Sequence, residues 1–539
     1  MITLQGKGVS PGIVKGRIRF LINESPFVER RSVDDVEKEI DRFNEARNIA
    51  INQLDTLYKT TIGKIGEENA LLFKIHSMML NDSDYTDPVI EIIKTEKTCA
   101  EYAVHTAGSC LAKDFADMDD DYMKARSVDV YDITKRLIYI LTGKGEVDGS
   151  DNEPAILAAD DFTPSETARF DPEKVRGLIS MQGAATSHTA IFARTMGIPA
   201  IVGLGSFLTG DLSGKEAIMN GETGILYIEA DDETINELEK KSELAKSERE
   251  KLEQLRGQPT LSKGGSSIRL YANIGSVNDI EAALAGDAEG IGLFRSEFLF
   301  LGRDDYPDEE TQYENYRKVL EKMKNRSVIF RTLDIGADKQ TAYFNLPKEE
   351  NPALGMRAIR FCLTNPDIFM TQLRAIYRAS VYGSAAIMFP MINSLNELRQ
   401  AKEIAKAVRD ELADKNILFK TIPVGIMIET PASALISDIL ANEADFFSIG
   451  TNDLTQYTLA IDRQNGSISA FCDTHHEAIL RLIRMTCENA HRSGIWCGIC
   501  GGLAADLTLT QTFIEMGIDE LSVEPSYILK MRSTISECC

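Results

Sequence analysis

Several features that assign a protein to a membrane or to a nucleic acid are absent from this 539-residue sequence. It has no N-terminal basic-then-apolar leader and no apolar run long enough to cross a bilayer. Positive charge is scarce: the chain has 59 Lys and Arg residues but 83 Asp and Glu residues, and its formal net charge is -24. So acidic a surface repels a phosphate backbone. We therefore expect a cytoplasmic protein without nucleic-acid binding or direct membrane insertion.

A disulfide framework is also missing. The nine cysteines are odd in number and scattered through a large chain, so most are expected to be reduced. Cys497 and Cys500 have the C-x-x-C spacing of a thiol redox motif or of half a zinc site. A second C-x-x-C or a histidine pair is missing nearby, and the motif closes a strand-like run. The pattern therefore disfavours redox or zinc chemistry.

The C-terminal half repeats one pattern, and the chain is long enough for three or four domains. In residues 263–539 a short apolar run, a polar turn and an amphipathic helix follow one another repeatedly. The apolar runs start near Ile268, Glu289, Ser327, Ser384, Ile422, Asp445, Ile495 and Asp519. Eight strands alternating with helices predict a (β/α)8 barrel of the TIM type.

The N-terminal half is organised differently. Residues 34–143 have a helical period with few strand signals and predict an inserted helical subdomain. They interrupt an α/β domain predicted for residues 1–33 and 144–230. Residues 231–262 predict a mostly solvated linker helix followed by a Gly- and Ser-rich linker. The expected fold class is multidomain α/β, with the barrel in residues 263–539.

One histidine stands out in GAATSHTAIFARTMGIPAIVG, residues 183–203. Small residues before His188 leave its imidazole open to a bulky reactant, and neighbouring hydroxyl side chains can hydrogen-bond around it. Such a histidine can act as a nucleophile, with Thr195–Gly203 forming a turn and a buried strand. The alternative is a histidine that only caps the helix after it. The barrel half of the chain favours the nucleophile.

Polar side chains close several of the predicted barrel strands. Because TIM barrels carry their chemistry at the C-terminal ends of the strands, these residues are a candidate site. They are Arg295, Arg331, Asp334, Glu429, Asn452, Asp453 and Cys500. Arg357 and Arg463 join them from intervening loops.

The arginines of this set favour a small ligand with several negative charges, since a guanidinium matches phosphate and carboxylate oxygens. Glu429 and Asp453, on neighbouring strands, can supply hard oxygen ligands to Mg²⁺. Taken singly, an arginine is more often a solvated surface charge. Paired structural ions are the alternative for the two acids.

The helical subdomain contains an apolar and acidic segment, HSMMLNDSDY at residues 76–85. It places Met78 and Met79 beside Asp82 and Asp84, and DFADMDDDY at 114–122 is also strongly acidic. Methionine at this spacing more often belongs to a core. An apolar patch rimmed with carboxylates would instead suit a partner with a basic face.

Several long segments, in order, resemble enzyme I of the phosphoenolpyruvate-dependent sugar phosphotransferase system. They are GVSPGIVKGRI, GAATSHTAIFARTMGIPAIVG, GIGLFRSEFLF, RTLDIGADK, NPALGMRAIR, VGIMIETPASAL and FFSIGTNDLTQYTLAIDR. The likeness runs over nearly the whole chain. It implies a swivelling phosphohistidine α/β domain ahead of the barrel, and a homodimer formed through the barrel.

The resemblance also implies a reaction. His188 takes the phosphoryl group of phosphoenolpyruvate and passes it to a histidine of a small phosphocarrier protein docked on the helical insert. Thr167 orients the imidazole, and Cys500 protonates the enolate to give pyruvate. The implied substrate-binding residues are Arg295, Arg331, Arg357, Asn452, Asp453 and Arg463, and the implied Mg²⁺ ligands are Glu429 and Asp453.

Two alternatives stay open. A pyruvate phosphate dikinase or phosphoenolpyruvate synthase shares the histidine domain and the barrel, but also needs an ATP-binding domain. Residues 1–150 contain neither the length nor a glycine-rich phosphate loop for one. The other alternative is a non-catalytic regulatory scaffold, for which His188, the arginines and both acids would be unnecessary.

Overall fold

The computed structural model divides the chain into two compact units, Met1–Ser247 and Glu248–Cys539. It describes residues 1–21, 28–65, 67–118, 121–143, 153–168, 170–183, 187–301, 303–336, 342–344, 346, 349–463 and 465–539. Within these residues, no helix combines the length and the apolar character that a membrane crossing requires. The domain boundaries predicted from the sequence are finer than this division and stay predictions.

An eight-stranded mixed sheet forms one part of the first unit, in the order β1-β8-β7-β3-β4-β5-β6-β2. Its strands are β1 (Ile2–Gln5), β2 (Lys7–Ser10), β3 (Ile13–Phe20), β4 (Ala155–Ala159), β5 (Val175–Ser180), β6 (Ala200–Val202), β7 (Glu216–Asn220) and β8 (Ile225–Ile228). Strands β3 to β6 pair in parallel and the others pair antiparallel. The sheet therefore joins the first residues of the chain to residues that follow the helical insert.

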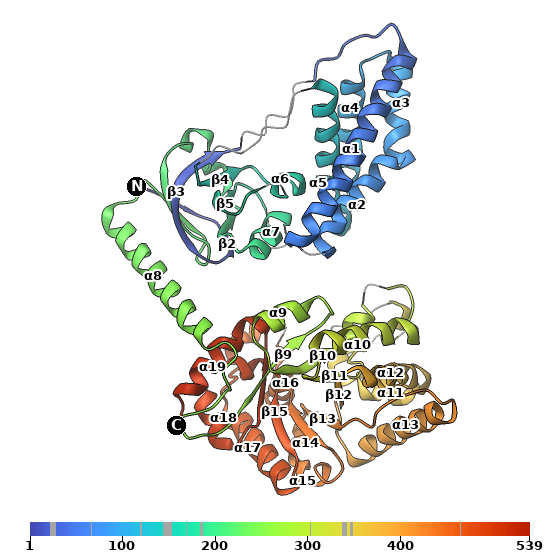
Figure 1. Ribbon diagram of the computed structural model, residues 1–539, viewed down its shortest axis with the longest axis vertical. Helices are drawn as coiled ribbons and strands as arrows, with labels where there is room; N and C mark the ends of the chain where they lie inside the picture. Colours follow the sequence, from blue (N-terminus) through green and yellow to red (C-terminus); the bar gives the residue numbers. More distant parts are fainter. Residues whose placement is uncertain are drawn as a thin grey trace. The chain divides into compact units, whose positions relative to one another are not determined.

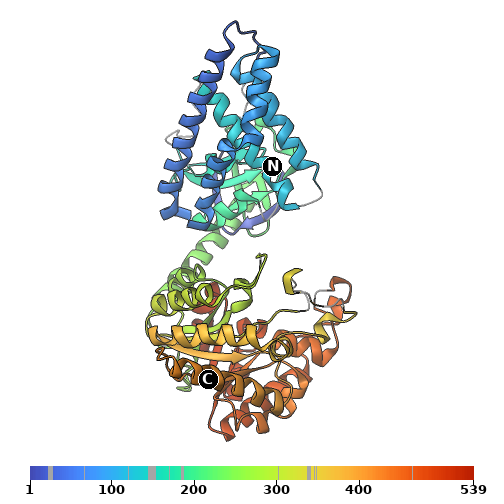
Figure 2. The ribbon, with the colours of Figure 1, turned by 90° about the vertical axis from the view of Figure 1, so that its right-hand side faces the viewer.

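A bundle of helices forms the other part of this unit, and its long helices run alongside one another (Figure 2). The helices are α1 (Val36–Ile65), α2 (Glu67–Asn81), α3 (Ser83–Glu96), α4 (Ala100–Ala116) and α5 (Asp121–Thr142). Apolar side chains such as Phe43, Phe73 and Leu137 form a core of their own between them. The helical subdomain is thus a separately packed bundle inserted between β3 and β4.

Two short helices lie beside the sheet. Helix α6 (Pro164–Thr167) begins with a capping box, in which Thr163 and Glu166 each bond the other's backbone N–H. Helix α7 (His188–Met196) is capped by the Ser187 hydroxyl and ends at Gly197, whose φ of 65° is left-handed. The turn predicted from Thr195 therefore begins after Met196, because the helix continues to its glycine cap.

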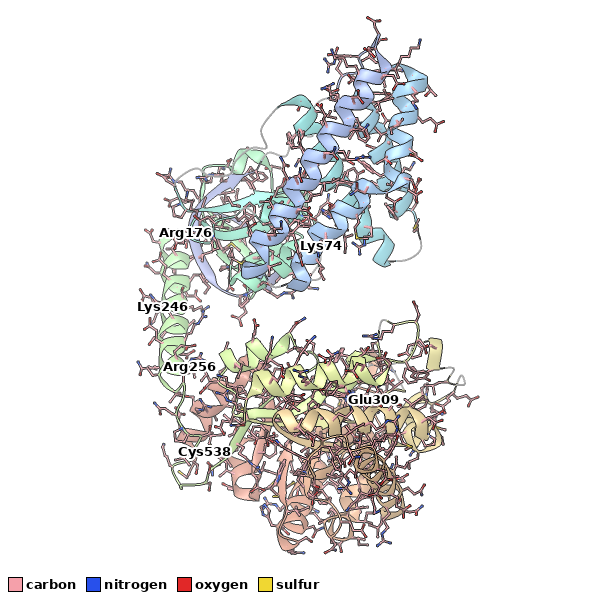
Figure 3. All side chains as sticks on the ribbon, turned by 45° about the vertical axis from the view of Figure 1, so that its right-hand side comes forward. Lys74, Arg176, Lys246, Arg256, Glu309 and Cys538 are labelled. Carbon is pink, nitrogen blue, oxygen red and sulfur yellow. The ribbon has the colours of Figure 1, made fainter. Side chains whose placement is uncertain are left out.

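Helix α8 (Asp232–Gln254) contains the division between the two units. Leu238 is the buried residue of this helix. Side chains project from it on several sides, including Lys246, and Arg256 follows just after its end (Figure 3). The prediction of a mostly solvated helix in this region agrees with this burial.

The second unit is a closed barrel of eight parallel strands, β9 to β16, with helices around it (Figure 1). Its strands are β9 (Arg269–Ile274), β10 (Gly290–Arg295), β11 (Ser327–Arg331), β12 (Ser384–Phe389), β13 (Val424–Ile428), β14 (Phe446–Ile449), β15 (Trp496–Ile499) and β16 (Glu520–Val523). Each strand lies in one of the eight runs predicted from the sequence. The barrel prediction is confirmed.

Helices of the barrel unit cover the outside of the strands. They are α9 (Asp279–Ala285), α10 (Glu309–Met323), α11 (Ile359–Thr364), α12 (Pro366–Ala379), α13 (Leu395–Asp414), α14 (Pro431–Leu435), α15 (Ser437–Leu440), α16 (Thr451–Leu459), α17 (Glu477–Arg492), α18 (Thr510–Met516) and α19 (Ile528–Glu537). One large apolar core packs between strands and helices. A smaller cluster, which includes Leu293, Met427 and Phe446, fills the interior of the barrel. The strands are therefore packed on both faces, as parallel strands require.

Candidate active site

One cavity of about 270 Å³ lies at the C-terminal ends of the barrel strands. Its polar lining comprises Arg295, Glu297, Arg331, Asp334, Arg357, Glu429, Asn452, Asp453, Arg463 and Cys500. Every barrel residue that the sequence analysis named as a candidate lines this cavity. The structure thus brings these side chains together, while the role of each stays a prediction.

Arg331 ends β11 and is buried between two carboxylates. Its Nη2 donates to Glu297 Oε1 at 2.6 Å, and its Nη1 lies 3.0 Å from Asp334 Oδ2. Burial alone would lower the pKa of Arg331, but Glu297, Asp334 and Glu429 outweigh it and raise that pKa. The guanidinium is therefore charged and held in a fixed orientation.

Arg357 reaches the same cavity from the loop before α11. It donates from Nε to Asp334 Oδ1 at 3.0 Å and from Nη1 to Asp453 Oδ1 at 2.9 Å. Its Nη1 also donates to the Tyr457 hydroxyl at 3.0 Å, and that hydroxyl donates to the Ala353 carbonyl at 2.5 Å. Tyr457 thus ties this arginine to the loop that carries it.

Arg295 and Arg463 contrast with the two buried arginines. Arg295 lies 3.7 Å from Glu524 and its side chain is 36% exposed. Arg463 lies 3.9 Å from Asp453 and is 35% exposed. At these distances and exposures the pairs are weak. Both guanidiniums therefore keep donors that can turn to an anionic ligand in the cavity.

Glu429 follows β13 and is the most isolated acid of the cavity. Its Oε1 accepts from the Met391 N–H at 2.6 Å, whereas its buried Oε2 has no hydrogen-bond partner among the described residues. Burial, followed by the charges of Asp453 and Asp334, raises the pKa of Glu429 to about 8. The charges of Arg357 and Arg331 oppose this shift. A positive ligand at Oε2 would stabilise the ionised carboxylate.

Cys500 and Asn452 complete the lining. The Cys500 thiol is 3% exposed and lies 3.8 Å from the Ile449 carbonyl oxygen. Burial raises its pKa to about 12, so the thiol keeps its proton near neutral pH. Asn452 Oδ1 accepts from the Gly502 N–H at 2.8 Å, which fixes the loop after Cys500.

The backbone is strained at two points beside these side chains. Ala358, directly after Arg357, has a φ of 53°, and Met391, whose N–H bonds Glu429, has a φ of 56°. Residues with side chains rarely adopt positive φ, and such strain gathers at functional sites. The surrounding packing therefore holds this cavity in a defined shape.

The carboxylates of the cavity are candidate ligands for a divalent cation. In the part of the chain that the structure describes, no group of three or more His, Cys, Asp or Glu side chains is arranged to hold a metal. Mg²⁺, however, binds through one or two carboxylates together with water and substrate phosphate. The unpartnered Glu429 Oε2 and the neighbouring Asp453 carboxylate fit that requirement.

In the first unit, His188 is the first residue of α7. Its side chain and residues 184–186 lie outside the described part of the chain, so the predicted open surroundings of the imidazole stay a prediction. The Thr189 hydroxyl donates to Asp161 Oδ1 at 3.1 Å and thereby joins α7 to the segment before α6. Thr167 is buried in α6, and its hydroxyl donates to the Pro164 carbonyl at 3.0 Å.

The candidate partner surface lies on α2 and α3. Met78 is 71% exposed, whereas Met79 is partly buried and packs against the bundle core. Asp82 caps α3 by accepting from the Asp84 N–H at 3.0 Å, so it has a local structural role as well. Residues 119 and 120 of the second acidic segment lie outside the described residues.

Two residues of the cavity network were not predicted from the sequence. Glu297 lies two positions after Arg295 and pairs with Arg331, and Tyr457 bridges Arg357 to its loop. The position of Glu297 directly after a strand was a usable signal. Tyr457 looks like an ordinary aromatic residue of a helix, and the sequence gives no signal for its role.

Three family models cover most of the chain. They describe a PEP-utilising enzyme: its N-terminal region matches residues 5–126, its mobile domain residues 151–224 and its PEP-binding domain residues 249–538. The phosphoenolpyruvate-protein phosphotransferase of Listeria innocua is 41% identical over 542 residues, which cover 99% of this chain and 93% of that protein. The chain belongs to the phosphoenolpyruvate-protein phosphotransferase family. The predicted family and enzyme class are confirmed.

Two further relatives have the same name. The phosphoenolpyruvate-protein phosphotransferase of Bacillus subtilis is 40% identical over 539 residues, covering 100% of this chain and 95% of its own length. That of Haemophilus influenzae is 39% identical, covering 99% and 93%. A solution structure of an Enzyme I protein (nEIt) is 32% identical and covers 45% of this chain and 99% of its own, with a TM-score of 0.39.

Proposed function

We propose that this chain transfers the phosphoryl group of phosphoenolpyruvate to His188, releases pyruvate, and passes the group to a histidine of a small phosphocarrier protein. The cavity at the barrel mouth carries the proposal. Two partly exposed guanidiniums, two buried ones, four carboxylates and a protonated thiol surround one small space. Phosphoryl transfer depends chiefly on positioning and on neutralising oxygen charge, and this set does both.

Within the cavity the residues divide by role. Arg295 and Arg463, which keep unused donors, bind the phosphate and carboxylate oxygens. Arg331 and Arg357, held by Glu297, Asp334 and Asp453, supply fixed positive charge beneath them, and Asn452 orients the loop after Cys500. As the phosphoryl group leaves, an enolate remains, and the Cys500 thiol protonates its methylene carbon. His188 is the acceptor, and Thr167 orients its imidazole.

Mg²⁺ is the metal we assign, with Glu429 and Asp453 as its protein ligands. It would neutralise charge on the substrate oxygens. The assignment rests on the unpartnered Glu429 Oε2, since a bound cation would hold this carboxylate in its ionised form. In Glu429→Gln the half-saturating Mg²⁺ concentration should rise in an assay of pyruvate release, while Asn442→Asp, a surface control, should leave it unchanged.

The phosphocarrier would dock on the insert at Met78, Met79, Asp82 and Asp84. The exposed Met78 offers apolar area, and the carboxylates favour a partner with a basic face. A homodimer through the barrel and a cytoplasmic location complete the proposal. Both rest on the resemblance and on the sequence.

The deciding experiment uses phosphoenolpyruvate labelled in its phosphoryl group. The wild type should acquire an acid-labile, base-stable label and pass it to added phosphocarrier. His188→Ala should take none, while still binding phosphoenolpyruvate through the barrel. Label retained in the variant would contradict the assignment. ATP with pyruvate should label nothing, and labelling from ATP would favour the dikinase or synthase alternative. A regulatory scaffold would take no label from either donor.

A further inference from the structure

A second buried acid of the barrel lies outside the network at its mouth. Glu520 is the first residue of β16 and is 0% exposed. Across the described residues, neither carboxyl oxygen finds a hydrogen-bond partner. An ionised carboxylate in such a place would be very costly, so the acid is kept in its neutral form.

Two glycines make room for this acid. A Cβ at Gly498 of β15 would stand 2.0 Å from Glu520 Oε2, and a Cβ at Gly292 of β10 would stand 2.3 Å from Oε1. Strand β9 separates β16 from β10 in the barrel, so Glu520 can approach Gly292 only through the interior. The carboxyl group therefore lies inside the barrel.

This interior leads to Cys500. Cys500 directly follows β15, and its side chain belongs to the apolar cluster that fills the barrel interior. A Cβ at Gly292 would also stand 2.5 Å from Ser522 Oγ, so the Ser522 hydroxyl lies close to the Glu520 carboxyl group. The Ser522 hydroxyl donates to Asn273 Oδ1 at 2.7 Å. Asn273 Nδ2 in turn donates to the Cys500 carbonyl at 3.2 Å. A polar layer thus lies between the acid and the thiol segment.

We propose that Glu520 is the proton reserve of Cys500: it holds a proton inside the barrel and returns it to the thiolate after each protonation of enolpyruvate. The inference rests on the proposed function, because Cys500 must first act as the acid. Glu520 does not touch the substrate and acts through Cys500. It is therefore a positioning residue, whose effect on the reaction is to return the proton of Cys500.

The Cys500 S–H bond breaks as a C–H bond forms at the methylene carbon of enolpyruvate, which leaves pyruvate and a buried thiolate. The Glu520 O–H bond then breaks and the S–H bond forms again as the proton crosses the barrel interior, in which Ser522 lies near the acid and Ser448 near the thiol. Uptake of one proton from solvent restores the Glu520 carboxyl group.

The charges around Glu520 favour this direction. Burial, opposed by Arg269 and assisted by Asp519, raises the pKa of Glu520 to about 8. The pKa of Cys500, raised to about 12, is higher, so the thiolate is the stronger base. Burial is the main cause that raises the pKa of Tyr271, and the hydrogen bond with Cys487, followed by burial, raises that of Cys497; the Glu520 charge adds to both shifts. Neither is a stronger acid than Glu520.

Rapid-quench measurement of pyruvate with the full chain, Mg²⁺, phosphoenolpyruvate and excess phosphocarrier tests the proposal. Because Cys500 starts protonated, Glu520→Gln should keep the first-turnover burst while its steady-state rate falls about 10–100-fold. In the wild type the steady-state rate should fall as pH rises through about 8, and the burst should not. Titration of Glu429 would change the burst and the steady-state rate alike. A pH dependence of the steady-state rate alone therefore belongs to Glu520.

Glu515→Gln, an exposed acid of the same unit, is the matched control and should change neither phase. A burst that falls together with the steady-state rate, or a steady-state rate that does not fall, would overturn the proton reserve. If Glu520→Gln does not fold, the different pH dependence of the burst and the steady-state rate in the wild type decides the question alone. Failure of the proposed function is separate: Cys500→Ala would then form pyruvate at the wild-type rate.

Discussion

The two compact units bury ionisable side chains in different ways. In the first unit, His76 is fully buried between Asp129 and Asp132, at 3.1 and 3.5 Å. Asp132 also accepts from the Ser165 hydroxyl at 2.5 Å. This network joins α2 and α5 to α6 and lines no cavity among those described. In the barrel unit, the network of Arg331 and Arg357 opens onto one.

The difference separates a structural network from one prepared for a ligand. Around His76 the ionisable side chains link helices to each other. Both networks contain buried atoms without a hydrogen-bond partner among the described residues: His76 Nδ1 in the first unit, and Arg331 Nε and Glu429 Oε2 in the barrel unit. Only the barrel residues of this set line the cavity described above. Buried polar groups are normally satisfied, so an unsatisfied set around a cavity points to a missing ligand. The predictions below test this division between the units.

The largest effect should come from separating the units. A fragment of residues 1–257 keeps the sheet and bundle cores, which contain no residue beyond Ile228. It retains His188 and Thr167 but lacks every arginine of the barrel cavity. It should accept phosphate from phosphorylated carrier and none from phosphoenolpyruvate. Electrophoresis of labelled protein would measure both reactions.

Salt provides the control for that experiment. Exchange with the carrier should slow as ionic strength rises, since an acidic surface steers a basic partner through screened charge. A folded fragment that exchanges nothing with the carrier would overturn the docking site. Labelling of the fragment by phosphoenolpyruvate would overturn the assignment of the donor site to the barrel.

The next largest effect compares two arginines of one cavity. Arg357→Ala leaves Asp334 and Asp453 buried without their partner and should cost about 3–5 kcal/mol of barrel stability in urea unfolding. Arg295→Ala removes a half-exposed pair and should cost less than about 1 kcal/mol. Turnover should fall in both. Equal stability losses would show that burial does not distinguish the two arginines.

The barrel was predictable because its signals are local and repeated. Each strand is a short apolar run before a helix, and the fold then places the strand ends together, which is how Arg295, Glu429 and Cys500 could be grouped. Glu297 was missed although its place just after β10 was a signal, and Tyr457 gave no signal; the contacts of both are long-range. Glu297 meets Arg331 and Tyr457 meets Arg357, and no periodicity in the sequence encodes either pair.

Glu520 shows the same limit in another form. In the sequence it is one residue of an apolar run and looks like a solvated strand end. Only the closed barrel reveals that Gly292 and Gly498 face it. The end of α7 differs from the prediction for another reason. The sequence predicts a turn from Thr195, but the helix continues to Met196 and ends at its glycine cap, Gly197.

One buried acid in each unit, Glu520 in the barrel and Glu101 in the first unit, should contribute to the pH dependence of stability with opposite signs. Burial raises the folded pKa of Glu520 to about 8, above its unfolded value, so its contribution is complete below about pH 4.3 and is lost as pH rises to 8. For Glu101, burial is outweighed by Arg42 and Arg31, which lower its pKa. Its contribution is present above the unfolded pKa and is lost as pH falls.

Hydrogen exchange of peptides from each unit, followed across pH 3 to 8, would measure this contrast. Glu520→Gln should flatten the loss at high pH in the barrel, and Glu101→Gln should flatten the loss at low pH in the first unit. A variant whose pH profile matches that of the wild type, or that flattens the loss at the opposite end of the pH range, would contradict the assignment of its carboxyl group.

The smallest effect compares two helix caps. Ser394 caps α13 in a reciprocal box with Glu397, whereas Ser187 caps α7 with one bond to the Ala190 N–H at 3.3 Å. Replacing either serine with alanine should cost about 1 kcal/mol of unfolding free energy, with Ser394 the larger because its box is lost as well. Ser187→Ala should also slow phosphorylation of His188, because α7 begins at that residue and the cap fixes its backbone. Ser394→Ala should leave this rate unchanged, and an equal slowing in both variants would mean that the cap of α7 has no part in presenting the histidine.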